Sequence, residues 1–361
     1  MNICIITPSV DENNWLYGAF CPWIKSLSEQ VDNILVLTLK KGMFDFKDNV
    51  RVVQIKSNSA KIFTLVNLYK NIISYNKKYP ISCFFTHMCP IYVTALFPLK
   101  CILKIPVIMW HAHGLKSFKL RLAEMFCDKI ISSSRSGFPL ETNKLSVTGQ
   151  AINTDRFKAS STDVSLKRIL YAGRISRIKN IFAIVETMNV LRSRGFDDIM
   201  LSLAGTASTE KDAEYMRKVK EYVSSKSLEK NIEFLGPVSY RDIHNVYNNS
   251  GIFLNLSDTD SLDRSVLEAM SSGNIVITSN RAFKPFYLDK SPALFLEKKE
   301  PGYIADKIVN IISMDSMSLY RLKNDFREFA VINHKIDNTI YKILRIFRET
   351  VNEKKSGHKK Q

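Results

Sequence analysis

Residues 168–195 read RILYAGRISRIKNIFAIVETMNVLRSRG, and this stretch decides the fold class. The apolar run over 168–172 predicts a strand, a glycine then opens a polar loop, and apolar residues at helical spacing over 180–194 predict a helix. Gly195 ends that helix, as glycine commonly does at a helix C-terminus. A strand followed by a loop and a helix is the repeating unit of a parallel α/β sheet.

The same rhythm recurs on both sides of this stretch. Further strands are predicted at 2–7, 33–38, 50–55, 81–86, 107–110, 129–133, 199–204, 232–235, 252–256 and 275–278, and further helices at 19–30, 62–75, 210–227, 240–248, 262–272 and 337–351. Two doubly wound α/β domains in tandem account for this pattern and for the length of 361 residues. We place an N-terminal domain at 1–155, a second domain at 156–335, and at 336–361 a C-terminal helix with a basic tail that frays from residue 352.

The composition limits the partners and the compartment. Lys and Arg total 52 against 35 Asp and Glu, and the net charge of +17 favours anionic partners such as nucleotide diphosphates, anionic lipid or nucleic acid. The six cysteines form no Cys-x-x-Cys pair, which argues against zinc and for buried free thiols in a reducing compartment. The sequence has no signal-peptide pattern and no apolar run of ~20 residues, so we expect a cytoplasmic protein.

The common motifs for phosphate binding and hydrolysis are missing from the sequence. It has no G-x-x-x-x-G-K-[ST], and no G-x-G-x-x-G follows the first strand, which argues against a P-loop nucleotidase and a dinucleotide dehydrogenase. Ser-His-Asp and nucleophile-elbow patterns are missing as well.

Two basic side chains follow the strand predicted at 168–172. Gly173 frees the backbone at the carboxyl end of that strand, where Arg174 and Lys179 can reach one anion. A guanidinium fork and an ammonium together suit a diphosphate. The alternative is a solvated basic loop.

Two acids eight residues apart lie around a predicted helix start. Asp260 falls in the loop and Glu268 in the helix, so both can line one ligand and accept hydrogen bonds from sugar or ribose hydroxyls. The helix start itself favours an anion. In one alternative, Asp260 is a helix cap and Glu268 a surface acid. In another, Asp258 and Asp260 bind Mn²⁺ or Mg²⁺.

These pieces occur in the order and spacing of a known family. Gly173-Arg174…Lys179, Leu203-Ala204-Gly205, the stretch 234–238 and Asp260…Glu268-Ala269-Met270…Gly273 resemble blocks of the retaining glycosyltransferases of family 4, which have the GT-B fold. Residues 106–114 and 149–157 resemble further blocks, so the resemblance covers nearly the whole chain. It implies two Rossmann-like, doubly wound domains that face a central cleft.

The resemblance implies a role for each matching position. Arg174 and Lys179 hold the donor diphosphate, Glu268 holds the ribose, Asp260 contacts the transferred sugar, and His113 lies near the reacting centre. Beyond these catalytic residues, the expected substrate-binding residues are Gly18, Gly205, Gly236, Val238, Leu262, Asp263, Arg264 and Ser265. The resemblance implies no metal and no cofactor other than the donor substrate, a UDP- or GDP-sugar.

The chain departs from the family pattern in the loop before residue 264. Asp260 stands where the family has a glutamate, and Ser261-Leu262-Asp263 replaces a Gly-Phe-Gly-like stretch. Either Asp260 or Asp263 therefore makes the sugar contact.

The implied activity is sugar transfer, with retention, from a nucleotide sugar to a saccharide or lipid-linked saccharide in bacterial surface polysaccharide synthesis. Rival interpretations are a sugar-nucleotide epimerase, an inactive partner subunit, and a nucleic-acid- or anion-binding protein, although no aromatic-plus-basic motif for nucleic acid is present.

Basic and apolar residues alternate in two segments of the first domain. Lys61, Lys70, Lys77 and Lys78 surround the helix predicted at 62–75, and Lys116, Lys119 and Arg121 lie among apolar residues. Such faces can rest on an anionic membrane, so a peripheral position on the inner face of the cell membrane is a further expectation. The alternative is a core helix with a solvated basic side.

Overall fold

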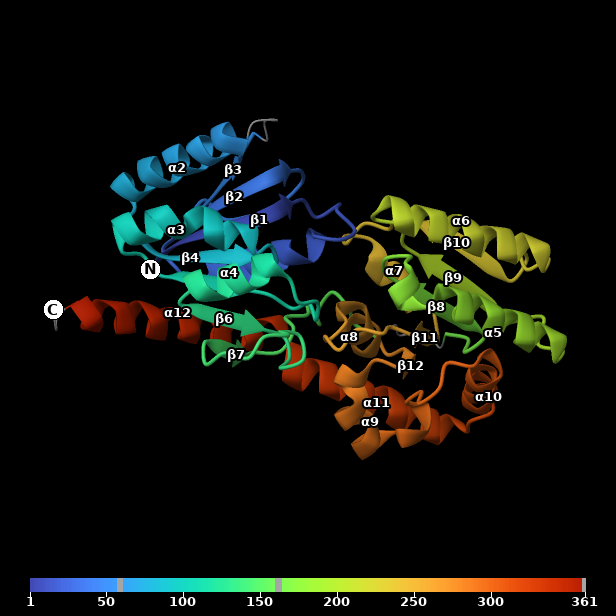
Figure 1. The fold of residues 1–361 in the computed structure, drawn as a ribbon. Coiled ribbons are helices and arrows are strands. Elements are labelled where there is room, and N and C mark those ends of the chain that lie inside the picture. The colour runs from blue at the N-terminus through green and yellow to red at the C-terminus, as the bar shows by residue number, and fades with distance from the viewer. Residues whose placement is uncertain (57–60, 160–163, 359–361) are drawn as a thin grey trace. The chain divides into compact units, whose positions relative to one another are not determined.

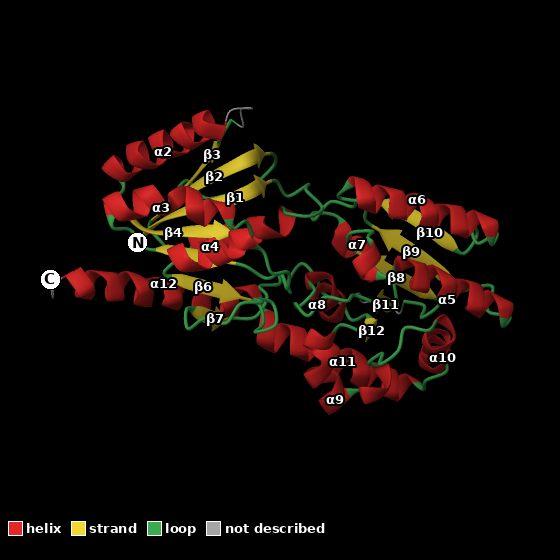
Figure 2. Cartoon of the chain, viewed as in Figure 1, coloured by secondary structure: helices red, strands yellow, loops and turns green. Residues whose placement is uncertain are grey.

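The computed structural model describes residues 1–56, 61–159 and 164–358, and it divides the chain into two α/β units (Figure 1, Figure 2). Unit 1 comprises Met1–Ala151 and Ile336–Gln361, and unit 2 comprises Ile152–Lys335. The first boundary lies a few residues before the one we placed at 155/156. Each unit is built on a parallel sheet, so the predicted fold class of two doubly wound domains is confirmed.

Unit 1 contains a seven-stranded sheet of order β3-β2-β1-β4-β5-β6-β7, in which every pair is parallel. Its strands are β1 (Asn2–Val10), β2 (Asn33–Lys41), β3 (Val50–Gln54), β4 (Ile81–His87), β5 (Val107–Trp110), β6 (Lys129–Ser132) and β7 (Leu145–Val147). Its helices are η1 (Gly18–Phe20), α1 (Cys21–Ser28), α2 (Lys61–Lys78), α3 (Ile91–Leu103), α4 (Phe118–Phe126) and α12 (Ile336–His358).

Alternation along the strands explains how helices cover both faces of this sheet. In β1, Ile3 and Ile5 pack in a core with α1 and α12, whereas Cys4 and Ile6 pack in a second core with α2, α3 and α4. Successive side chains of a strand point to opposite faces, so a strand buried on both sides reads as a continuous apolar run.

Several element ends differ from the sequence prediction, and two of these differences have a clear structural basis. Strand β1 continues past residue 7 through Pro8. Beyond Ile6, β1 pairs with β2 but no longer with β4, so it is an edge strand there. Proline, which cannot donate a backbone hydrogen bond, is tolerated in edge strands. The predicted fraying from residue 352 is wrong, since α12 runs to His358. Val351 is buried, and Lys354 pairs with Asp128 at 3.6 Å between Nζ and Oδ1, so the last turns of α12 keep contacts in unit 1.

Unit 2 contains a five-stranded sheet of order β10-β9-β8-β11-β12. Its strands are β8 (Arg168–Ala172), β9 (Met200–Ala204), β10 (Ile232–Gly236), β11 (Ile252–Asn255) and β12 (Ile275–Thr278). Its helices are η2 (Arg177–Lys179), α5 (Ile181–Ser193), α6 (Glu210–Ser225), α7 (Ile243–Asn248), α8 (Arg264–Ser271), η3 (Arg281–Phe283), α9 (Lys284–Lys290), η4 (Pro292–Leu294), α10 (Pro301–Ile312) and α11 (Ser316–His334).

Two further sequence expectations concern the cysteines and the membrane. Each of the six cysteines is a free thiol, as predicted, but the expectation that they are buried is wrong for Cys101, which is exposed, while Cys89 is half-buried. Among the described residues, no helix has both the length and the apolar character needed to cross a bilayer.

Candidate functional site

The sheet of unit 2 has a switch point between β8 and β11. From β8 the chain continues outward to β9 and β10 on one side, and then returns to add β11 and β12 on the other. Strands β8 and β11 pair only through Ile169 with Ile252 and Leu170 with Phe253. In doubly wound sheets, ligands bind outside the carboxyl ends of the strands at such a point. The loops that leave β8 and β11, residues 173–180 and 256–263, therefore frame the candidate site.

Asn180 ties these two loops together. Its side-chain amide donates to the Leu256 carbonyl at 2.8 Å and to Asp258 Oδ2 at 2.7 Å, and the Asp258 N–H donates to the Ile178 carbonyl at 3.0 Å. Asp258 also pairs with Lys299. Asp258 is thus engaged in holding the loops, and within the described ranges no group of three or more His, Cys, Asp and Glu side chains is placed to hold a metal.

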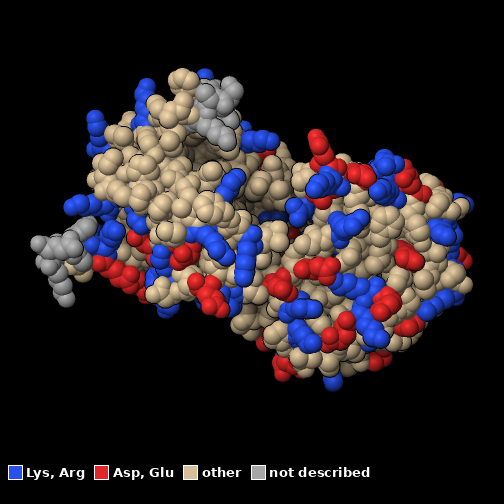
Figure 3. Space-filling view, in the orientation of Figure 1, with Lys and Arg blue, Asp and Glu red and all other residues tan. Residues whose placement is uncertain are grey.

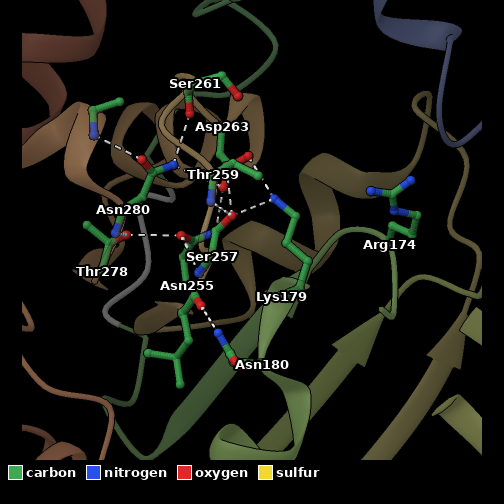
Figure 4. Close-up of polar contacts among 12 residues, drawn as sticks. Arg174, Lys179, Asn180, Asn255, Ser257, Thr259, Ser261, Asp263, Thr278 and Asn280 are labelled. Atoms are coloured by element: carbon green, nitrogen blue, oxygen red, sulfur yellow. Dashed lines mark hydrogen bonds and ion pairs between the residues drawn. The ribbon is translucent and has the colours of Figure 1, made fainter. Parts of the chain in front are cut away.

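Lys179 and Asp263 form the centre of a largely buried polar network (Figure 4). Lys179 Nζ lies 2.8 Å from Asp263 Oδ1 and 3.0 Å from Ser257 Oγ, and the two charged side chains are only 14% and 13% exposed. Asn255 and Asn280 donate their amides to Asp263 Oδ2 at 3.1 and 3.2 Å. Burial by itself raises the pKa of Asp263, but the Lys179 charge and these hydrogen bonds outweigh it and hold the pKa below its usual value.

Arg174 stands apart from this network. Figure 4 shows its side chain on the same loop as Lys179, and over the three described ranges its guanidinium makes no hydrogen bond and no ion pair. The backbone is fixed instead, because the Tyr171 hydroxyl donates to the Arg174 carbonyl at 2.7 Å. Of the two cations that the sequence analysis assigned to one diphosphate, Lys179 is thus held by a carboxylate, whereas the Arg174 guanidinium has no partner in the described ranges.

Glu268 lies behind the loop, inside the unit. It is 4% exposed, its Oε2 accepts a hydrogen bond from the Tyr247 hydroxyl at 3.0 Å, and its Oε1 lies 3.0 Å from Arg264 Nε. Burial raises the pKa of Glu268, although Arg264 and Tyr247 both favour the ionised form. The structure therefore places Glu268 among protein partners, one helix turn below the start of α8.

The pH dependence of stability tests this placement. A raised pKa means that the folded protein holds the Glu268 proton more tightly than the unfolded chain, so stability falls as pH rises from the ordinary glutamate value, 4.5, through the folded-state pKa. Glu268→Gln removes this ionisation and keeps an acceptor for Tyr247. We expect the variant to lose less stability than wild type over that pH interval in urea unfolding. Exposed Glu186→Gln is the control, and a wild-type pH profile for Glu268→Gln would contradict the placement.

Three glycines bring the backbones close together at the carboxyl ends of β8, β9 and β10. Gly173, Gly205 and Gly236 have φ values of +150°, +144° and +71°. The Gly173 N–H donates to the Ala204 carbonyl at 2.9 Å and the Gly205 N–H to the Gly236 carbonyl at 2.7 Å. A Cβ on Gly205 would lie 1.8 Å from the Gly173 carbonyl oxygen. Gly205 therefore sets the position of the loop that carries Arg174.

Replacing Gly205 by alanine is expected to lower the free energy of unfolding by about 2–3 kcal/mol, because the backbone conformation disfavours a side chain and Gly173 must move. The matched control is Gly195→Ala, where φ is +86° but a Cβ would meet nothing within 4 Å. Only the conformational cost, about 1–2 kcal/mol, should appear there. Urea unfolding measures both values, and equal losses would show that the contact with Gly173 has no cost.

The remaining predicted residues are distributed over both units. Asp260 is exposed in the β11–α8 loop, and Leu262, Arg264 and Ser265 are half-buried at the start of α8. Val238 follows β10 and is half-buried. In unit 1, Gly18 is buried at the start of η1, and His113 lies half-buried after β5, where its Nδ1 accepts a hydrogen bond from the Leu115 N–H at 3.3 Å.

The sequence analysis did not identify the asparagines of the site. Asn255 ends β11 and Asn280 follows β12, and both are almost fully buried, whereas Asn180 lies between η2 and α5. A buried amide at the carboxyl end of an apolar strand is the signal that could have indicated them, since such a group needs hydrogen-bond partners.

Most of unit 2 is similar to a known family. Residues 153–330 match the family model described as "Glycosyl transferases group 1". No curated protein matches the chain by sequence.

Solved structures share the fold over almost the whole chain. HepE from Anabaena, solved with UDP and glucose, is 13% identical with a TM-score of 0.77, over 96% of this chain and 99% of that one. Sucrose-phosphate synthase from Thermosynechococcus elongatus is 14% identical with a TM-score of 0.77, over 97% and 98% of the two chains. WaaG, a glycosyltransferase involved in lipopolysaccharide biosynthesis, is 12% identical with a TM-score of 0.67, over 96% and 99%. Residues 153–330 are therefore similar to the group 1 glycosyltransferases, and the chain as a whole has the GT-B fold.

Proposed function

We propose that unit 2 binds a nucleotide sugar with its diphosphate on Arg174, and that the enzyme transfers the sugar to a saccharide acceptor with retention of configuration. The observation that carries the proposal is the unpaired guanidinium of Arg174, within the described chain, at the switch point of a parallel sheet. The neighbour HepE was solved in complex with UDP, so we propose UDP as the nucleotide of the donor. We propose a donor that needs no metal ion, because Arg174 supplies positive charge for its diphosphate.

The proposed reaction is a displacement on the face from which the diphosphate leaves, through an oxocarbenium-like state. Arg174 stabilises the charge that develops on the leaving diphosphate, whose oxygen takes the proton of the acceptor hydroxyl. Asp263 already accepts hydrogen bonds from Lys179, Asn255 and Asn280, so we assign it to holding Lys179 and not to attack on the sugar. Catalysis then rests on charge stabilisation and alignment.

We assign the contact to the transferred sugar to Asp260. The Asp263 side chain is only 13% exposed, whereas Asp260 is exposed to solvent in the same loop. The proposed acceptor is a saccharide, free or linked to lipid, of a bacterial surface polysaccharide, and the proposed site of action is the cytoplasm.

A thermal-shift panel of nucleotides and sugar nucleotides tests the donor site. A ligand at 100 times its dissociation constant stabilises the protein by about 2.7 kcal/mol. We expect UDP and at least one UDP-sugar to do so, and Asp260→Asn to weaken binding of the UDP-sugar but not of UDP. No stabilisation by any nucleotide would overturn the donor site, and an epimerised sugar formed without acceptor would replace transfer by epimerisation.

A further inference from the structure

Unit 1 carries an apolar face on helices α3 and α4 that the donor site does not use. It consists of six exposed side chains, five on the two helices and Leu115 in the loop before α4, which we call the apolar face: Ile91, Phe97, Ile102, Leu115, Phe118 and Met125. Phe118 at the start of α4 is 79% exposed and Ile102 near the end of α3 is 73% exposed, which are high values for side chains of this size. Single exposed apolar residues need no explanation, but a continuous group of them marks an interaction surface.

The two helices form one continuous surface. The rings of Phe97 on α3 and Phe126 on α4 stack with their centroids 4.1 Å apart, and Lys100 Nζ donates to the Phe126 carbonyl at 2.6 Å. The inner sides of both helices pack on the sheet through Val93, Leu96, Leu99, Leu120 and Ala123. Helix α3 is thus apolar on its outer as well as its inner side, a pattern that is ordinarily found in helices covered on all sides.

Four cations, which we call the basic rim, accompany the apolar face: Lys104, Lys116, Lys119 and Arg121. All four are exposed, and none forms an ion pair with a carboxylate of the described ranges. The acids nearest in the chain have partners, because Glu124 pairs with Lys144 at 3.7 Å and Asp128 with Lys100 at 2.8 Å. Figure 3 shows a broad tan area over α2, α3 and α4 with blue side chains around it.

We propose that the apolar face and the basic rim dock unit 1 onto the surface of an anionic lipid bilayer. A bilayer surface offers both chemistries at once, an apolar layer for the six side chains and negative headgroups for the four cations. A second copy of the chain, placed by a twofold axis on the same face, would bring the two basic rims together and would be disfavoured by like charge. The proposal does not depend on the donor site, since lipid binding needs no nucleotide.

Sedimentation of the full chain with vesicles tests the proposal. Wild type is expected to bind vesicles of phosphatidylcholine mixed with phosphatidylglycerol and to bind pure phosphatidylcholine at least roughly tenfold more weakly, because each basic residue near an anionic surface adds attraction. Ile102→Glu with Phe118→Glu is expected to weaken binding to the mixed vesicles by more than tenfold. Lys116→Gln with Lys119→Gln should remove most of the preference for the anionic lipid and most of its salt dependence.

The matched control is Leu288→Glu with Met317→Glu, which changes two exposed apolar residues of unit 2 and alters the net charge equally. It is expected to bind the vesicles as wild type does. Absence of wild-type binding to the mixed vesicles, or an equal loss in the control, would overturn the proposal. A wild-type dimer in light scattering that Ile102→Glu with Phe118→Glu converts to a monomer, without vesicle binding in either, would assign the face to a second copy. If UDP stabilises every variant as much as wild type, a loss of vesicle binding is not caused by failure of the donor site.

Discussion

Arg174→Ala is expected to lower kcat by about 10²–10³, the usual loss when one preorganised donor to a developing negative charge is removed. The guanidinium has no partner in the described chain, so its removal leaves no unpaired protein group behind and the fold should keep its stability. Steady-state kinetics with the donor identified by thermal shift, together with urea unfolding, measures both effects.

Two further variants separate the role of Arg174 from positive charge in general. Arg177→Ala removes an exposed cation three residues along the same loop and should leave kcat close to wild type. Arg174→Lys keeps the charge but loses the planar fork of donors, so an intermediate rate is expected. If Arg174→Ala keeps wild-type activity, or if Arg177→Ala loses as much, Arg174 does not have the role assigned to it.

Lys179→Met is expected to destabilise unit 2 by about 3 kcal/mol, because it leaves the Asp263 carboxylate without its cation in a site where both side chains are largely buried. The pH dependence should also change sign. In wild type the lowered pKa of Asp263 means that its contribution to stability is present above the ordinary aspartate value, 3.8, and is lost as the pH falls through the folded-state pKa. Without Lys179, protonation of Asp263 relieves the buried charge, so the penalty should shrink as the pH falls.

A double-mutant cycle isolates the pair. Asp263→Asn alone leaves Lys179 without its carboxylate, and the double variant Lys179→Met with Asp263→Asn leaves neither charge buried. We expect the double variant to be more stable than the sum of the single losses predicts, with a coupling in the range of 0.5–3 kcal/mol. Strictly additive losses in urea unfolding would show that the pair is not a unit. Activity should fall in all three variants, since each variant either removes the Lys179 ammonium or removes the carboxylate that orients it.

The strands of unit 2 were predictable because each one is a short apolar run between a turn and a polar loop. Strands β8 and β12 have the bounds that the sequence analysis gave them, as does β5 in unit 1. Helix α3 was not predicted, and its sequence explains why. Its residues are apolar on every side and include Pro98, so it has neither an amphipathic period nor an uninterrupted helical pattern.

The sequence indicated the basic loop of the candidate site, but not its asparagines or the pairing of its side chains. Glycine followed by Arg174 and Lys179 at a strand end indicated an anion site from the sequence alone. The contact between Lys179 and Asp263 joins residues 84 apart, and the amides of Asn255 and Asn280 reach the same carboxylate from two further strand ends. Such contacts depend on which strands become neighbours in the sheet, and spacing along the chain does not encode that directly.

Hydrogen–deuterium exchange of the full chain, with and without saturating UDP, tests most directly whether the carboxyl edge of the second sheet binds the donor diphosphate. The account predicts that protection increases in the two loops around the switch point, residues 173–180 and 256–266, and that Arg174→Ala abolishes this increase at the same UDP concentration. Protection of other segments of unit 2 alone, for example along α11, would contradict it, as would UDP binding that Arg174→Ala leaves unchanged.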